Sequence, residues 1–157
     1  MSSRFLHSIL ILLALLGLAC GEATMEEVQG EQLLSACNQH NWPLAEHLLE
    51  KGISVDHRVS QFDGRTVLML SVSRPKAVAF LLDRGANPDL RDIHGGTALM
   101  LAAEEGKAQT VGLLLADGAD PNLRDSSGLS ALDRATKARR HDVVELLRRQ
   151  LPPTPEH

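Results

Sequence analysis

The chain has 157 residues, of which 43% are hydrophobic and 23% are charged, and its formal net charge is −4 at neutral pH. The length and composition fit one folded domain. Nucleic-acid binding is disfavoured, because it depends on clustered Lys and Arg that neutralise phosphates. The acidic balance persists without the first 19 residues, since they contain one Arg and no acidic residue.

The N-terminal segment has the layout of a secretory signal. Arg4 precedes an apolar run from Ile9 to Leu18, and small residues surround Cys20. The run is too short to span a bilayer comfortably as a permanent helix. We therefore predict that residues 1–19 are a signal peptide that is removed, and that the protein is exported.

Residues 16–20, Leu-Gly-Leu-Ala-Cys, resemble a bacterial lipobox, although Gly17 stands where that family prefers Leu. The resemblance implies that Cys20 receives lipid, becomes the first mature residue and holds a periplasmic protein on a bacterial membrane. Ordinary cleavage after Ala19 or Ala23 is the alternative. The polar residues 20–30 are predicted to be a tether, with a frayed first helix as the other interpretation.

Glycines recur at a fixed spacing after apolar segments. A glycine just past a helix end can adopt the left-handed conformation that ends the helix. The separation is 33 residues in each of these pairs: Gly52 and Gly85, Gly85 and Gly118, Asp92 and Asp125, Gly95 and Gly128. The spacing predicts repeated units with equivalent helix ends.

Residues 92–124 show the unit most clearly. Small and apolar residues 97–103 predict one helix, and Gly106 marks the turn into a second helix. The second helix places Val111, Leu114 and Leu115 on one apolar face. Neither helix is long enough to be stable alone, so each pair must be buried between neighbouring pairs.

This unit resembles the ankyrin repeat. The matching residues are Asp92, Gly95, Thr97, Leu99, Ala102, Gly106, Val111, Leu114, Leu115, Gly118, Ala119, Asp120 and Asn122. The resemblance implies an all-α solenoid of about four helix-turn-helix repeats with β-turn or hairpin fingers. We expect repeats at about 31–58, 59–91, 92–124 and 125–150, followed by a loose tail at 151–157. Ala98-Leu99-Met100 replaces the family's Pro-Leu-His, so apolar packing must substitute for the histidine's hydrogen bonds.

The repeats depart from regularity in several places. The spacing of glycines gives the loop at residues 56–63 two extra residues, and the second repeat loses two near residues 71–74. We therefore predict a local distortion beside Pro75. Trp42 is expected to cover the end of the stack. The last repeat is predicted to be basic through Lys137, Arg139, Arg140, Arg148 and Arg149.

No arrangement of residues predicts catalysis, a metal or a cofactor. Cys37, His40 and His47 make a weak zinc set without a fourth ligand. Cys37 matches Ala103 in the repeat alignment, which favours a small buried residue. A disulfide between Cys37 and Cys20 remains open only if cleavage occurs upstream of Cys20. The aspartates at 92, 120 and 125 are predicted to cap turns.

The resemblance implies that a partner protein binds the fingertips and the exposed side of the inner helices. The candidate residues are Phe62, Asp63, Arg65, Ile93, His94, Gly96, Glu104, Glu105, Ser126, Ser127, Leu129, Lys137 and Ala138. From the repeat alignment, Phe62, Ile93 and Leu129 are expected to line up along the fingers. Such an apolar row favours a binding role, because a few apolar or aromatic anchors supply most of the binding energy. The alternative is that Phe62 and Ile93 pack between adjacent fingers.

The predicted function is a non-enzymatic, envelope-located interaction module, expected to be a monomer that binds another protein and no nucleic acid. Two alternatives remain open. One is an immunity or inhibitor protein for a periplasm-acting toxin or enzyme. The other is an accessory protein to an envelope enzyme, such as one that acts in oxidative stress.

Overall fold

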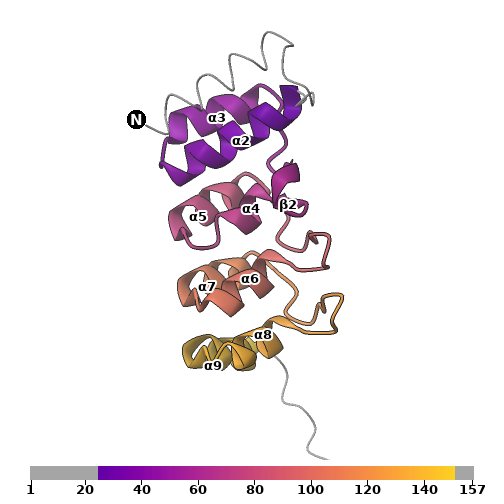
Figure 1. Ribbon diagram of the computed structural model, residues 1–157. Coiled ribbons are helices and arrows are strands. Elements are labelled where there is room, and N and C mark those ends of the chain that lie inside the picture. Colours follow the sequence, from indigo (N-terminus) through magenta and orange to yellow (C-terminus); the bar gives the residue numbers. More distant parts are fainter. Residues whose placement is uncertain (1–24, 151–157) are drawn as a thin grey trace, which may run out of the picture.

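Four helical hairpins stack in a single row, with the loops that join them projecting from one side (Figure 1). The first helix of each hairpin is called the inner helix and the second the outer helix. The computed structural model describes residues 25–150. The helices are α2 (Met25–Asn38), α3 (Trp42–Glu50), α4 (Val67–Leu70), α5 (Pro75–Asp83), α6 (Ala98–Glu105), α7 (Ala108–Ala116), α8 (Ala131–Lys137) and α9 (His141–Gln150). The prediction of an all-α repeat solenoid is confirmed. No helix in this range is long and apolar enough to cross a bilayer.

The core is a continuous apolar strip between successive hairpins. Leu33, Leu68, Leu99 and Leu114 are buried in it, and Leu147 closes it in the last repeat. Because each hairpin buries its apolar face only against its neighbours, no repeat has a core of its own. The short helices are therefore stable only as members of the stack.

Glycines follow three of the outer helices, and threonines begin two of the inner helices. Gly52, Gly85 and Gly118 have left-handed φ values of 93°, 81° and 94° just past the outer helices, which confirms the predicted helix ends. The hydroxyl of Thr97 accepts a hydrogen bond from the Met100 N–H and starts α6. Thr66 does the same for α4. A side-chain cap of this kind satisfies one of the free N–H groups of the first turn.

The turn between inner and outer helix requires a left-handed residue in three repeats. Gly106 fills the position with φ 74°, and His40 and Arg139 fill it with φ 56° and 58°. A residue with a Cβ is strained there by roughly 1–2 kcal/mol. The repeat geometry thus holds His40 and Arg139 in a backbone conformation that residues with a side chain disfavour.

The inner helix of the second repeat is shorter than that of the third, which agrees with the predicted distortion beside Pro75 where two residues are missing. Helix α4 has 4 residues where α6 has 8. Val72 follows the shortened helix, and its carbonyl accepts a buried hydrogen bond of 2.8 Å from the Thr110 hydroxyl of α7. The neighbouring repeat therefore satisfies a carbonyl beside the deletion.

The inserted loop forms the one β-hairpin within residues 25–150. Strands β1 (Arg58–Val59) and β2 (Arg65–Thr66) pair antiparallel, with Arg58 opposite Thr66. The 3-10 turn η1 (Ser60–Phe62) joins the strands and uses the two extra residues. The predicted insertion is therefore confirmed as a longer first finger.

Residues 25–30 belong to α2, so the alternative of a first helix applies to them and the predicted tether does not. Gly30 is buried, and a Cβ on it would stand 1.8 Å from Cδ2 of His57. This glycine lets the helix lie directly against the imidazole ring. The predicted signal peptide, Cys20 and the tail at 151–157 lie outside the described residues.

Trp42 does not cover the end of the stack as predicted. Its ring stacks on Phe80 of α5 in the next repeat, with centroids 5.0 Å apart and planes at 27°. The guanidinium of Arg84 lies over the Phe80 ring, 4.7 Å from its centroid. Arg84 also forms an ion pair with Glu46 of α3. The ring reaches α5 because the outer helices stack side by side, so Trp42 joins the first two repeats.

Candidate interaction surface

The second and third fingers, residues 92–96 and 125–129, are tight turns that are each held by one aspartate, whereas the first finger is the β1–β2 hairpin. The Oδ1 atom of Asp92 accepts hydrogen bonds from the N–H groups of His94 and Gly96, at 2.9 and 2.8 Å. Asp125 makes the same two bonds to Ser127 and Leu129. The prediction that these aspartates cap turns is confirmed. Such bonds fix the backbone of the turn and hence the direction of its side chains.

Neighbouring fingers are joined by backbone hydrogen bonds. The Ile93 N–H donates to the Asp63 carbonyl at 3.0 Å, and the Ser126 N–H donates to the His94 carbonyl at 2.9 Å. The three fingers therefore form one ridge along the stack, visible on one side of the helical hairpins (Figure 1). The ridge is therefore a single braced surface.

Three arginines brace the fingers further, in a pattern that the sequence analysis missed. Arg58 Nη1 donates to the Gly64 carbonyl of its own finger and to the carbonyl of Arg91, both at 2.7 Å. Arg91 Nη1 repeats this with Gly95 at 3.4 Å and with the carbonyl of Arg124 at 2.7 Å. We name Arg58, Arg91 and Arg124 the arginine ladder. Their 33-residue spacing, equal to that of the glycines, was the available signal.

Two large apolar side chains stand exposed on the ridge. Phe62 is 47% exposed and Ile93 is 67% exposed, so neither is buried between fingers. Leu129 does not extend this row, contrary to the prediction. Ser126 takes the place of Ile93 in the last finger, because its N–H makes the equivalent hydrogen bond. Leu129 instead matches Gly96 at the base of the finger and is half-buried.

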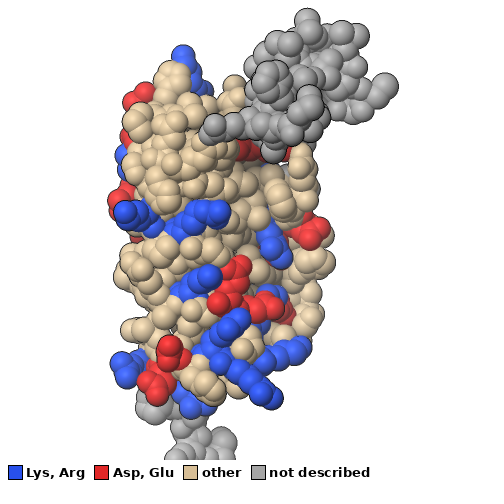
Figure 2. All heavy atoms as spheres, turned by 60° about the vertical axis from the view of Figure 1, so that its left-hand side comes forward, with Lys and Arg blue, Asp and Glu red and all other residues tan. Residues whose placement is uncertain are grey.

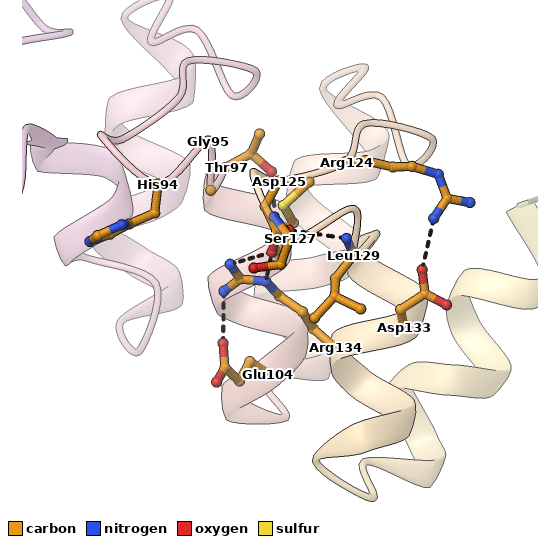
Figure 3. Close-up of polar contacts among 12 residues, drawn as sticks. His94, Gly95, Thr97, Glu104, Arg124, Asp125, Ser127, Leu129, Asp133 and Arg134 are labelled. Atoms are coloured by element: carbon orange, nitrogen blue, oxygen red, sulfur yellow. Dashed lines mark hydrogen bonds and ion pairs between the residues drawn. The ribbon is translucent and has the colours of Figure 1, made fainter.

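An ion-pair network joins the last two inner helices beside the ridge. Arg134 donates through Nε and Nη2 to Asp125 Oδ2 at 2.9 and 2.7 Å, and through Nη1 to Glu104 Oε2 at 2.8 Å. Figure 3 shows the guanidinium of Arg134 lying between the two carboxylates. The side chain of Asp125 is 3% exposed and that of Glu104 is 55% exposed. The network therefore reaches from the buried turn to the surface.

The network holds Asp125 in its charged form. Burial alone would raise the pKa of this carboxyl, but hydrogen bonds from Leu129, Arg134 and Ser127 lower it below its usual value. Asp133 also has a lowered pKa, because the Ser130 N–H and hydroxyl donate to it and Arg124 lies beside it. Both aspartates are thus built into the fold as anions.

The other candidate residues lie on the ridge or next to it. Asp63 and His94 approach each other at 3.9 Å, and Arg65 lies 3.5 Å from Asp92. Glu105 accepts a hydrogen bond from the Ser73 hydroxyl of the shortened repeat. Ser126 and Ser127 are exposed. The structure brings these residues together on adjacent fingers and inner helices.

Comparison with known protein families identifies the family of this chain. The family described as Ankyrin repeats (3 copies) matches residues 33–125 and 85–151. The chain belongs to the ankyrin-repeat family. No curated protein matches it significantly. Ankyrin repeats are in general modules for protein–protein interaction and typically are not catalytic.

The basic residues of this ankyrin-repeat protein lie where the sequence predicts. Lys137, Arg139, Arg140, Arg148 and Arg149 are exposed in the last repeat. Figure 2 shows Lys and Arg side chains, with acidic ones between them, over the C-terminal half of the helix side. Arg140 also donates to the Glu104 carbonyl at 3.0 Å. Arg140, one of these basic residues, therefore joins the last two repeats.

The only described cysteine of the ankyrin-repeat stack is buried. Burial raises the pKa of Cys37 to about 11, against the weaker opposite effect of a backbone hydrogen bond. The thiol is therefore protonated at neutral pH and a poor nucleophile. Within residues 25–150, no three His, Cys, Asp or Glu side chains gather as metal ligands.

Proposed function

We propose that this ankyrin-repeat protein is a non-enzymatic interaction module that captures a partner protein on its ridge of fingers. The observation that carries the proposal is the pair of exposed apolar side chains, Phe62 and Ile93, on neighbouring fingers. A few apolar or aromatic anchors supply most of the energy in protein interfaces. The other candidate contact residues are polar, namely Asp63, Arg65, His94, Glu104, Glu105, Ser126 and Ser127, apart from the half-buried Leu129 at the finger base.

The bracing of the fingers supports this role. Phe62 precedes a left-handed Asp63 with φ 53°, and the Asp63 carbonyl is bonded to the next finger. Ile93 lies in a turn fixed by Asp92. Because these backbones are already ordered, binding immobilises little more than side chains. Pre-organisation of this kind raises affinity by lowering the entropic cost of association.

The test is capture of a partner from envelope extract by the purified repeat domain and by its Phe62→Ala/Ile93→Ala variant. We expect the variant to lose the partner while keeping its melting temperature, since both side chains are exposed. Leu44→Ala is the matched control, because Leu44 is 41% exposed on α3, away from the fingers. Equal capture by all three proteins would refute the proposal, and loss of folding would reassign Phe62 and Ile93 to structural support.

We also propose that the protein is exported and held on a bacterial membrane by lipid on Cys20. The apolar segment before Cys20 supports export. Each buried CH₂ of an acyl chain contributes about 0.8 kcal/mol, so several chains anchor a domain firmly. Only residues 21–24 separate Cys20 from α2, which would place the first repeat nearest the membrane. Labelling with a fatty-acid analogue, lost in Cys20→Ser, tests the anchor, and an unlabelled, membrane-free wild type would refute it.

Affinity and the range of partners distinguish the narrower roles. An immunity or inhibitor protein would bind one secreted toxin or enzyme with nanomolar affinity. An accessory protein to an envelope enzyme would bind more weakly and accept several partners. Titration of each captured protein against the purified repeat domain therefore decides between them.

A further inference from the structure

The arginine ladder uses only one side of each guanidinium. In Arg58 and Arg91 the two hydrogen bonds to backbone carbonyls both leave from Nη1. Arg124 likewise donates through Nη1, to the Gly128 carbonyl and to Asp133. Each guanidinium is therefore fixed in place while its other edge, formed by Nε and Nη2, has no partner among the side chains that the structure describes.

That edge binds carboxylates elsewhere in the same molecule. Arg84 donates to Glu46 through Nε and Nη2, and Arg134 donates to Asp125 through the same two atoms. The planar guanidinium offers two parallel N–H groups there, which match a carboxylate. The ladder thus presents three fixed copies of a geometry that this protein already uses for acidic groups.

The nearby aspartates do not occupy these edges. Asp56 Oδ1 accepts from the Asn87 N–H at 2.9 Å, and Asp89 Oδ1 accepts from the Asp120 N–H at 3.0 Å. Neither forms an ion pair with the ladder. Arg58, Arg91 and Arg124 are all exposed. Three guanidiniums therefore face solvent in a row, one for each finger.

The ladder adjoins the apolar anchors. The point where a Cβ on Gly64 would stand lies 3.3 Å from Ile93 Cγ2 and 3.8 Å from Arg58 Nη1. Ile93 and Arg58 are therefore neighbours around one glycine. A segment that contacts Ile93 comes within reach of the ladder.

We infer that the arginine ladder binds an acidic, extended segment of the partner protein, with one carboxylate for each arginine. The inference rests on the proposed function and names the chemistry of the partner. Packed helices lie about 8–10 Å apart, which sets the spacing of successive arginines. A polyproline II chain rises about 3.1 Å per residue with three residues per turn, so every third side chain shares a face at this spacing. The partner segment accordingly carries Glu or Asp at every third position.

The test uses a fluorescent proline-rich peptide with Glu at every third position, titrated into the purified repeat domain. Two control peptides carry Gln in place of Glu, or the same number of Glu residues side by side. We expect binding of the first peptide only. In the ¹⁵N-labelled protein, its addition should shift the Nε–H signals of Arg58, Arg91 and Arg124, and leave that of Arg148 unchanged.

The variant R58K/R91K/R124K separates a guanidinium site from simple charge attraction. Lysine keeps the positive charge and can donate to the carbonyls, but it lacks the paired N–H edge. We expect affinity for the Glu peptide to fall by about tenfold or more. The control R74K/R139K/R148K changes three arginines outside the ladder and should bind like the wild type.

Three results would overturn the inference: equal binding of the Gln or clustered peptide, equal binding of the R58K/R91K/R124K variant, or unshifted Nε–H signals of the ladder. The signals are read in the unaltered protein, so instability of the variant leaves that arm intact. If partner capture still depends on Phe62 and Ile93 when the peptide fails, only the ladder inference falls. If capture also fails, the proposed function falls with it.

Discussion

Replacing Arg134 with Met tests how far the last repeat depends on its ion-pair network. Arg134 is 17% exposed and contacts both Asp125 and Glu104. Methionine keeps much of the packed stem of the side chain but leaves the carboxylate of Asp125, 3% exposed, without its cation. The substitution should therefore act through electrostatics and hydrogen bonding rather than through a cavity.

The magnitude follows from the partners that remain. Removing one member of a fully buried ion pair costs about 3–5 kcal/mol. Asp125 keeps its hydrogen bonds from Ser127 and Leu129, and Glu104 can turn toward water. We therefore expect a loss of about 2–3 kcal/mol in the free energy of unfolding, near the value of hydrogen bonds to a charged group.

Urea denaturation of the wild type, Arg134→Met and Arg149→Met measures this loss. Arg149 pairs with Glu145 at 3.7 Å, and both side chains are about three-quarters exposed, at 76% and 75%. An exposed pair of this kind contributes only about 0.3–0.5 kcal/mol. If Arg134→Met costs no more than Arg149→Met, the buried network is not a source of stability and the reasoning is wrong.

Three further predictions concern a turn, the first repeat and pH. Arg139→Gly should stabilise the protein by about 1 kcal/mol, since relief of the left-handed strain exceeds the added freedom of glycine in the unfolded chain; an unchanged urea midpoint would contradict this. Gly30→Ala should destabilise it by about 1–3 kcal/mol, because the new Cβ overlaps a buried ring, and a thermal melt equal to the wild type's would exclude that contact. The lowered pKa values of Asp125 and Asp133 stabilise the folded state fully above the unfolded carboxyl pKa of about 4, and this contribution is lost as pH falls through the folded values; acid titration of stability measures it, and a flat profile below pH ~4 would refute it.

Most of the fold could be predicted from the 33-residue period of the sequence. Gly52, Gly85 and Gly118 mark helix ends because few other residues adopt their φ values without strain. A change in spacing between such fixed points can only lengthen or shorten the segment between them. That is why both the longer first finger and the shortened α4 were predictable.

The errors arose where a residue's partner lies in another repeat. Gly30 of α2 meets the His57 ring of the loop before the second repeat, and Trp42 stacks on Phe80 of the second repeat. Leu129 was aligned by its apolar character, although the hydrogen bonds of the finger set a different register. Local pattern does not encode these contacts.

The arginine ladder was overlooked for a related reason. A charged side chain in a loop is usually solvated, so Arg58, Arg91 and Arg124 did not stand out singly. Their shared period of 33 residues becomes meaningful only when each guanidinium is seen to bond a carbonyl of its own finger and, in Arg58 and Arg91, one of the next. Periodicity among polar loop residues thus points to contacts between repeats, as apolar periodicity points to the core.

The ladder also links the stability of the stack to the shape of the binding ridge. In a linear repeat protein each unit is stabilised mainly by its neighbours, and the fingers have few buried apolar contacts of their own. Their order depends on the bonds that Arg58 and Arg91 make across the repeat boundary. Separation of two repeats at either boundary would break such a bond and displace an apolar anchor together with its neighbouring guanidinium. Because the same groups that position Phe62 and Ile93 also join the repeats, the proposed function requires the ridge to bind as a unit.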